Sequence, residues 1–370
     1  MSNPSPLTAL PDRAQSTVAW SDPVREAAFQ RWLARIAPIH GLQPASLRLA
    51  SADASFRRYL RIDAGQGSRI IMDAPPDKED CEPFVKVAAL MEQAGLNVPR
   101  VLDWERNEGF MLLQDLGTQT MIEVVDAQVP DANRGLYMQA VDALVAWQLA
   151  SRPGVLPAYD HALLTRELAL YPDWYLAQHR GLKIEGQLRD TLDQTFALII
   201  ERNLASPSVY VHRDFMPRNL MIPAEPRLGE QMETRLGVLD FQDAVYGPIS
   251  YDIASLMRDA FLSWDEEFVL DITVRYWQRA QKAGLPVASD FGEFYRAVEW
   301  MGLQRHLKVA GIFARLTLRD GKPRYLADTP RFIAYIRATA SRYRELAPLL
   351  RLLDEAEGTQ QTAAYVFGRV

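Results

Sequence analysis

The sequence has little of the features that mark secreted or membrane proteins. Only one of its 370 residues is cysteine, so no disulfide framework can form and a reducing compartment is expected. No apolar run reaches the roughly 18 residues of a membrane-spanning helix. The first residues lack the basic and apolar stretches of a signal peptide. We therefore expect a soluble, cytoplasmic protein.

An excess of positive charge is also missing. The 41 Lys and Arg residues face 47 Asp and Glu residues, which gives a formal net charge of −6. Binding to nucleic acid or to an anionic membrane through bulk charge is therefore disfavoured. The length suffices for two lobes with a large core, and the hydrophobic fraction of 48% is ordinary. We expect no nucleic acid or membrane partner, and a monomer or weak homodimer.

What the sequence does contain is an H-x-D-x-x-x-x-N array between two apolar runs. His212, Asp214 and Asn219 occupy its fixed positions, and a later apolar run over residues 236–239 ends in Asp240. This order predicts a strand, a loop, a strand, a turn and a further strand with an acid at its end. Such a layout is typical of enzymes that move a phosphoryl group onto a hydroxyl.

The residue types fit that chemistry. Asp214 would accept the hydrogen bond, and finally the proton, of an attacking hydroxyl. Asn219 and Asp240 offer an amide oxygen and a carboxylate, which are hard ligands that suit Mg²⁺. The alternative is a buried hairpin with a polar bend, in which His212 is a core histidine and Asp214 a turn residue. The ordered set favours the catalytic interpretation.

Residues 212–219 and 239–243 resemble the aminoglycoside phosphotransferase family, small-molecule kinases with a protein-kinase-like fold. The similarity runs roughly from Pro44 to the region around Tyr343. It implies ATP and Mg²⁺ as cofactors and an α+β, bilobal fold, with a small antiparallel-sheet N-lobe and a larger, mainly helical C-lobe. We expect a flexible arm over 1–20, the N-lobe over 21–116 and the C-lobe over 117–370.

The resemblance also implies two nucleotide-binding segments. One is a turn that covers the phosphates, although glycine, usual there in the family, is missing; the other is a hinge that meets the adenine edge. The alternatives are a plain surface hairpin and a simple strand end. The residues concerned are Ala54, Ser55, Phe56 and Arg57 in the turn, and Gln114, Asp115 and Leu116 in the hinge.

A lysine is missing from the expected third strand over residues 68–73. A kinase of this shape places a lysine there to hold the α- and β-phosphates, and this strand instead ends in Met72 and Asp73. Arg57, Arg58 or Arg69 could substitute for it, and the sequence does not decide among them.

Several polar residues of the helical half are candidates for contact with the substrate. Glu167 and Trp174 could bond to sugar hydroxyls and stack on a sugar ring, although aromatics at helical spacing are usually core. Arg305 could meet an anionic substrate group or form an ordinary ion pair. Asp243 is either a turn residue or an acid near the metal.

Two further residues are expected to support the catalytic loop. The resemblance implies this role for Asp252, which could also be a first-turn acid of its own helix. His212 at the head of the motif is assigned the same supporting role.

The amino-acid sequences of other stretches, among them residues 71–76 and 304–308, resemble one branch of the family. That branch phosphorylates the anomeric hydroxyl of N-acetylmuramate and N-acetylglucosamine in peptidoglycan recycling. The resemblance thus implies an ATP-dependent sugar kinase. Alternatives are a kinase for choline, an aminoglycoside or a hydroxy amino acid, or a nucleotide-binding pseudokinase that regulates a partner.

Overall fold

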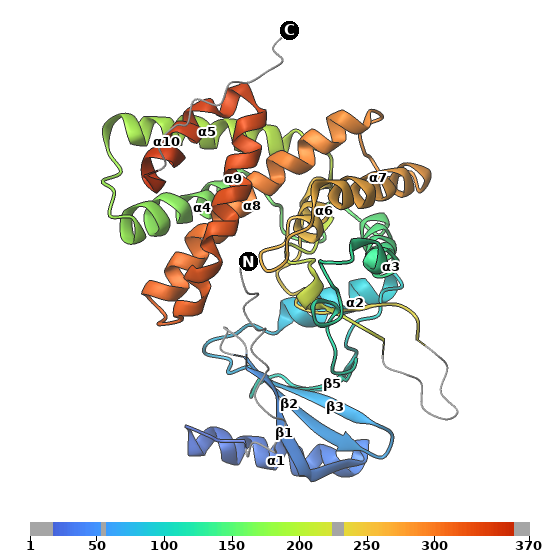
Figure 1. The fold of residues 1–370 in the computed structure, drawn as a ribbon. Coiled ribbons are helices and arrows are strands. Elements are labelled where there is room, and N and C mark those ends of the chain that lie inside the picture. Colours follow the sequence, from blue (N-terminus) through green and yellow to red (C-terminus); the bar gives the residue numbers. More distant parts are fainter. Residues whose placement is uncertain (1–17, 53–56, 224–232, 359–370) are drawn as a thin grey trace. The chain divides into compact units, whose positions relative to one another are not determined.

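The chain forms two compact units in a computed structural model, which describes residues 18–52, 57–223 and 233–358 (Figure 1). The first unit comprises Met1–Ala89 with Val98–Leu116, and the second Leu90–Asn97 with Gly117–Val370. The first contains a five-stranded sheet and the second is mainly helical. The expected α+β class is therefore confirmed. Three of the nucleotide-binding candidates, Ala54, Ser55 and Phe56, lie outside the described residues, as does most of the expected arm.

The first unit is an antiparallel sheet in the order β1-β2-β3-β5-β4. Its strands are β1 (Leu42–Ala52), β2 (Arg58–Ala64), β3 (Ser68–Asp73), β4 (Val101–Glu105) and β5 (Phe110–Gln114). Arg58 pairs with Asp73 in the register of β2 and β3, and Arg69 pairs with Gln114 in that of β3 and β5. Helix α2 (Glu82–Gln93) follows β3.

Helix α1 (Pro23–His40) covers one face of this sheet. It begins at Asp22, whose side chain accepts a hydrogen bond from the backbone N–H of Val24, and ends at Gly41 with φ of +61°. A left-handed residue after a helix favours glycine, which has no Cβ to clash. Apolar side chains of α1 and of the sheet form one buried cluster: Phe29, Trp32, Leu33 and Ile36 from the helix and Leu60, Ile62, Ile71, Phe110 and Leu112 from the strands.

The second unit contains most of the helices and two short two-stranded sheets. Its helices are α3 (Pro130–Leu149), α4 (His161–Leu170), α5 (Gly186–Leu204), α6 (Ser250–Met257), α7 (Glu266–Lys282), α8 (Phe291–Leu318), α9 (Thr329–Arg342) and α10 (Ala347–Glu357). The strands are β6 (Ser208–Val211), β7 (Leu220–Met221), β8 (Gly237–Val238) and β9 (Val245–Pro248). β6 pairs with β9, and β7 with β8, both antiparallel. Short 3₁₀ turns lie at Met121–Glu123, Pro217–Asn219, Pro323–Asp328 and Arg344–Leu346.

Helix α8 is the central helix of this unit and is buried along most of its length. A Cβ placed on its Gly311 would come within 2.3 Å of the backbone of Leu170, so glycine permits α8 to lie against the end of α4. After Leu170 the chain continues as a π-helix over Tyr171–His179. This close packing brings polar residues of α8 into contact with Glu167 of α4.

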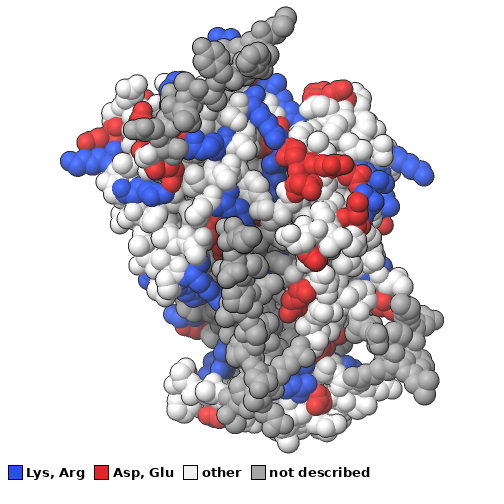
Figure 2. Space-filling model, in the orientation of Figure 1, with Lys and Arg blue, Asp and Glu red and all other residues white. Residues whose placement is uncertain are grey.

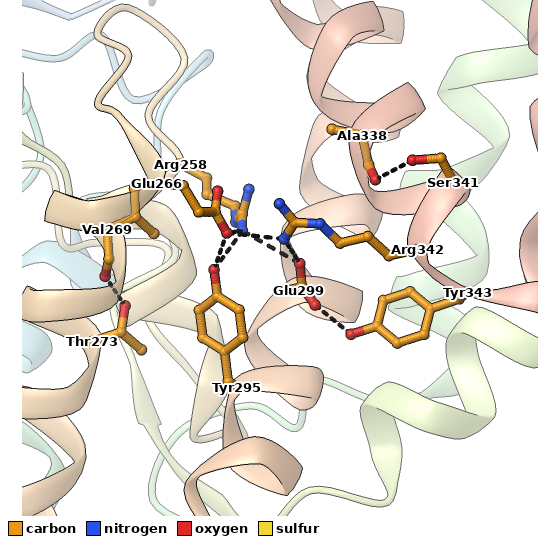
Figure 3. Close-up of polar contacts among 10 residues, drawn as sticks. All are labelled: Arg258, Glu266, Val269, Thr273, Tyr295, Glu299, Ala338, Ser341, Arg342 and Tyr343. Atoms are coloured by element: carbon orange, nitrogen blue, oxygen red, sulfur yellow. Dashed lines mark hydrogen bonds and ion pairs between the residues drawn. The ribbon is translucent and has the colours of Figure 1, made fainter. Parts of the chain in front are cut away.

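A polar cluster connects several helices of the second unit (Figure 3). Glu299 of α8 bonds to Arg342 of α9 and accepts a hydrogen bond from Tyr343, and Arg258 after α6 lies 3.6 Å from it. Glu266 of α7 accepts a bond from Arg342 at 2.9 Å. The cluster therefore links helices from four parts of the sequence.

The described surface carries charges of both signs. On the face drawn in Figure 2, acidic and basic side chains are interspersed over the described residues, without a broad basic area. Among the helices in the described part of the chain, none combines the length and apolar character needed to cross a bilayer.

Candidate active site

The catalytic loop lies between β6 and β7 of the second unit. β6 ends at Val211, and the loop returns through the 3₁₀ turn Pro217–Asn219 into β7. β7 pairs with β8, and the backbone N–H of Leu239 donates to the carbonyl oxygen of Asn219 at 2.9 Å. Because this pairing is antiparallel, it delivers Asp240 beside Asn219. The expected strand, catalytic loop and following pair of strands are therefore observed, while residues 224–232 between the paired strands lie outside the described residues.

Asn219 connects the two acids of the motif. Its Nδ2 donates to the backbone carbonyl oxygen of Asp214 at 2.8 Å and lies 3.4 Å from Oδ2 of Asp240. With the nitrogen engaged in this way, the amide oxygen is the atom left to act as a ligand. Asp240 is exposed, and its Oδ1 accepts a hydrogen bond from Gln242 at 2.9 Å. The structure thus brings Asp214, Asn219 and Asp240 together.

This set of donors fits Mg²⁺. A carboxylate and an amide oxygen are hard ligands, and Mg²⁺ usually takes one or two protein ligands and completes its shell with water and phosphate. No group of three or more His, Cys, Asp or Glu residues suited to a metal occurs in the described part of the chain. Asn219 and Asp240 are therefore suited to a metal that arrives with a nucleotide and not to a closed protein cage.

Backbone strain occurs next to both acids, at Arg213 in the catalytic loop and at Asp240 after β8. Arg213 has φ of +77° and Asp240 has φ of +63°, and these are the only non-glycine residues with positive φ among the described residues. The left-handed conformation costs about 1–2 kcal/mol for a residue with a Cβ. Such strain persists only where surrounding contacts hold it.

Asp252 of α6 is one of those contacts. Its fully buried carboxylate accepts hydrogen bonds from the backbone N–H of His212 at 2.7 Å and of Arg213 at 3.0 Å. Burial raises the pKa of Asp252 to about 6. The residue lies in the first turn of α6, as the helix alternative required, and it also meets the loop backbone.

His212 ties the loop to the strand that precedes Asp240. Its Nε2 lies 2.9 Å from the carbonyl oxygen of Leu239 and therefore carries the proton of a neutral ring. Its Nδ1 accepts the backbone N–H of Asp214 at 3.3 Å. Burial lowers the pKa of His212, which favours the neutral ring that this bonding pattern needs.

The four candidate substrate residues occupy very different environments. Glu167 and Arg305 are buried, at 4% and 3% exposed, and the guanidinium of Arg305 lies 5.3 Å above the ring centre of Tyr251. Trp174 is half-buried in the π-helix, and Asp243 is exposed. Their contact with a sugar stays a prediction.

The partners of Glu167 could not be predicted from the sequence. Its carboxylate meets Arg213, Lys308, Tyr159 and Gln304. Lys308 and Gln304 are more than a hundred residues away along the chain, so only the packing of α8 against α4 brings them into contact. A charge at a buried position of a helix was the one available signal.

The nucleotide-binding candidates of the first unit take part in ion pairs. Arg57 contacts Glu79 at 2.9 Å, and Asp115 accepts bonds from Arg61 at 2.6 Å and from the hydroxyl of Ser68 at 2.7 Å. The side chain of Gln114 accepts a bond from Arg100 at 2.9 Å, and Leu116 is half-buried.

Asp73, at the end of β3, lies near the position where the family lysine was expected. Asp73, at 2% exposed, is held by Arg25 at 2.5 Å and Arg58 at 2.6 Å. Because Arg25 belongs to α1, Asp73 faces that helix, and Met72 on the other face is fully buried. Arg58 is therefore engaged on the α1 side. Arg57, one residue earlier, pairs with Glu79, and the substitution of an arginine for the lysine stays a prediction.

Known proteins resemble the chain over most of its length. The model of the phosphotransferase enzyme family matches residues 46–290. The N-acetylmuramate/N-acetylglucosamine kinase of Pseudomonas aeruginosa is 50% identical over 310 residues, which cover 84% of this chain and 88% of that protein. The protein of the same name from Neisseria meningitidis serogroup B is 47% identical over 339 residues, which cover 91% and 97%.

Solved structures share the fold at low identity. A choline/ethanolamine kinase family protein from Mesorhizobium loti has a TM-score of 0.57 at 15% identity, and the match covers 90% of this chain and 99% of that one. The GDP complex of aminoglycoside 2′-phosphotransferase-IIIa has a TM-score of 0.56 at 14% identity, with coverage of 86% and 99%. These likenesses confirm the protein-kinase-like fold.

Proposed function

We propose, from the premise that the chain belongs to the phosphotransferase enzyme family, that it is an ATP-dependent amino-sugar kinase. Its substrate would be N-acetylmuramate, N-acetylglucosamine or both. The observation that carries this proposal is the identity of 47–50% to kinases of that name, which extends over most of both chains. The acceptor atom would be the anomeric hydroxyl, and the product would enter peptidoglycan recycling in the cytoplasm.

In the proposed reaction Asp214 orients the sugar. Its carboxylate accepts a hydrogen bond from the anomeric hydroxyl, whose oxygen then bonds to the γ-phosphorus of ATP. The bond from that phosphorus to the β–γ bridging oxygen breaks, ADP leaves, and the hydroxyl proton passes to Asp214. Orientation matters more than basicity here, because the proton leaves late in a loose transition state.

The cofactors follow from the same set of residues. Asn219 and Asp240 would hold Mg²⁺, which neutralises charge on the phosphate oxygens. In the first unit, Arg57 and the turn residues Ala54, Ser55 and Phe56 would lie against the phosphates, and the backbone of Gln114, Asp115 and Leu116 against the adenine. We propose accordingly that residues 21–116 form the nucleotide-binding lobe and 117–370 the catalytic lobe, in a monomer or weak homodimer.

The experiment is a measurement of ADP release with Mg-ATP and a panel of acceptors. The panel contains both N-acetylated sugars, glucosamine, choline and an aminoglycoside, and ³¹P NMR locates the new phosphate. Transfer to C1 of either N-acetylated sugar is the expected result. Turnover confined to choline or the aminoglycoside would replace the proposed substrate, and nucleotide binding without turnover on any acceptor would indicate a pseudokinase.

A further inference from the structure

Arg213 combines a strained backbone with an anchored side chain. It precedes Asp214 directly, at φ of +77°, where glycine would fit without strain. Its guanidinium bonds through Nη2 to Oε1 of Glu167 on α4. The direction in which the chain enters Asp214 therefore depends on where this side chain is held.

The carboxylate of Glu167, which anchors Arg213, is itself fixed by several side chains. Oε1 of Glu167 also contacts Nζ of Lys308 at 3.0 Å, and Oε2 accepts bonds from the hydroxyl of Tyr159 at 2.5 Å and from Nε2 of Gln304 at 2.9 Å. Lys308 and Gln304 both belong to α8. Three of the four partners thus lie outside the catalytic loop, so the carboxylate is placed by the helical framework and the loop docks onto it.

The anchor is also permanently charged. Burial alone would raise the pKa of Glu167, but Lys308 and Arg213 outweigh it and lower that pKa to about 2. A buried carboxylate with two cationic partners makes strong, short bonds to both. The Arg213 contact is therefore in place at every pH at which a kinase operates.

We propose that Glu167 is a positioning residue, which aims Asp214 at the acceptor hydroxyl by holding Arg213 in its left-handed conformation. This proposal rests on the proposed function for the identity of the acceptor. Because Glu167 would contact the catalytic loop and not the sugar, its replacement should lower kcat and change KM little. A misplacement of a catalytic group by about 1 Å can cost roughly 10²-fold in rate.

The molecule offers a matched control. Glu299 is as buried as Glu167, at 4%, and like it meets two cationic side chains and a tyrosine hydroxyl. It lies in the cluster of Figure 3, and within the described part of the chain none of its partners belongs to the catalytic loop. A purely stabilising role would make Glu167→Gln and Glu299→Gln behave alike. A positioning role separates them.

The experiment compares Glu167→Gln, Arg213→Gly, the double variant and Glu299→Gln. We expect kcat per folded molecule to fall about 10- to 100-fold in Glu167→Gln and in Arg213→Gly, with KM for the sugar and for ATP within about twofold. The double variant should fall no further, because Glu167 acts through Arg213. Glu299→Gln should keep its kcat. Arg213→Gly leaves Glu167 paired with Lys308, so it tests the proposal even if Glu167→Gln folds poorly.

A second measurement is independent of the acceptor. Hydrogen exchange followed by mass spectrometry on peptides spanning residues 208–216 should become about tenfold faster in Glu167→Gln and stay unchanged in Glu299→Gln. If the wild-type protein transfers nothing to amino sugars, the proposed function fails, while this exchange still decides the positioning role.

Three results would overturn the inference. A raised KM for the sugar with kcat retained would make Glu167 a substrate contact. Rate losses that multiply in the double variant would show that Glu167 and Arg213 act independently. Equal rate losses, or equal changes in exchange, in Glu167→Gln and Glu299→Gln would reduce Glu167 to a general stabilising residue.

Discussion

Two buried glutamates of the helical unit have similar surroundings and different neighbours. Glu167 and Glu299 each meet two cationic side chains and a tyrosine hydroxyl. Glu299 joins helices to one another, whereas Glu167 joins helices to a strained loop beside Asp214. The composition of a polar cluster therefore does not tell its role. What distinguishes the two clusters is that one partner of Glu167 belongs to the strained segment next to Asp214, whereas no partner of Glu299 among the described residues does.

The largest effect is expected at the reacting group. Asp214→Asn should lower turnover by roughly 10²–10⁴-fold, or about 3–5 kcal/mol of barrier, because the acceptor hydroxyl loses its base. Steady-state kinetics measure the loss, and thermal unfolding should show an intact fold. A loss below about tenfold in a folded variant would remove Asp214 from this role and with it the contrast between the two clusters.

In the cluster around Glu299, the variant Glu299→Gln should lower the stability of the fold. It leaves Arg258 and Arg342 with less compensating charge, at a cost of about 3 kcal/mol in the free energy of unfolding. Urea unfolding measures this change. A variant as stable as the wild type would show that this cluster, unlike the one around Glu167, contributes nothing that the neighbouring helices need.

A buried histidine, His306, should make the stability of the helical unit depend on pH. Its Nε2 lies 3.2 Å from the carbonyl oxygen of Arg258, and its buried Nδ1 has no hydrogen-bond partner among the described residues. Burial, aided by Arg258 and Arg305, lowers the pKa of His306 to about 3 from its ordinary 6.5. Because the folded pKa is the lower one, the stability from this group is complete above pH 6.5 and is lost as the pH falls toward 3.

Between pH 6.5 and 4.5 the loss should be about 2–3 kcal/mol, since each pH unit below the unfolded pKa costs about 1.36 kcal/mol. Urea midpoints across that range should change less in His306→Gln, which has no titrating ring and can still donate to the carbonyl oxygen. Equal slopes in the two proteins would mean that His306 is not held neutral.

The smallest effect concerns the strain itself. Arg213→Gly and Arg213→Ala both remove the guanidinium, but only alanine retains a Cβ at φ of +77°. Arg213→Gly should therefore be the more stable variant by about 1 kcal/mol, measured by thermal unfolding. Identical stabilities would indicate that the loop relaxes once Glu167 releases it.

The parts of the site that the sequence predicted correctly are local. Asp214, Asn219 and Asp240 lie on one loop and one short antiparallel pairing, so their order along the chain nearly fixes their meeting point. The first-unit strands around Arg58 and Asp73 were equally readable from their two-residue rhythm.

Residues whose meaning depends on long-range packing were harder to predict. Glu167 was expected to face a sugar, yet its helical spacing does not reveal which neighbour covers it. The pairing of Asp73 with Arg25 likewise required α1 to lie on the sheet. In both cases the partner comes from an element that no local pattern connects to the residue.

The residue types of the site are readable from neighbouring positions in the chain: an acid, an amide and a second acid in the order that phosphoryl transfer uses, with their strands encoded by adjacent apolar residues. The anchoring of Arg213 depends on long-range packing, because α8 lies against α4 and places Lys308 and Gln304 around Glu167, which pairs with Arg213. The physical reason is that hydrogen bonds within a loop are specified locally, whereas burial of a charge depends on every element that surrounds it.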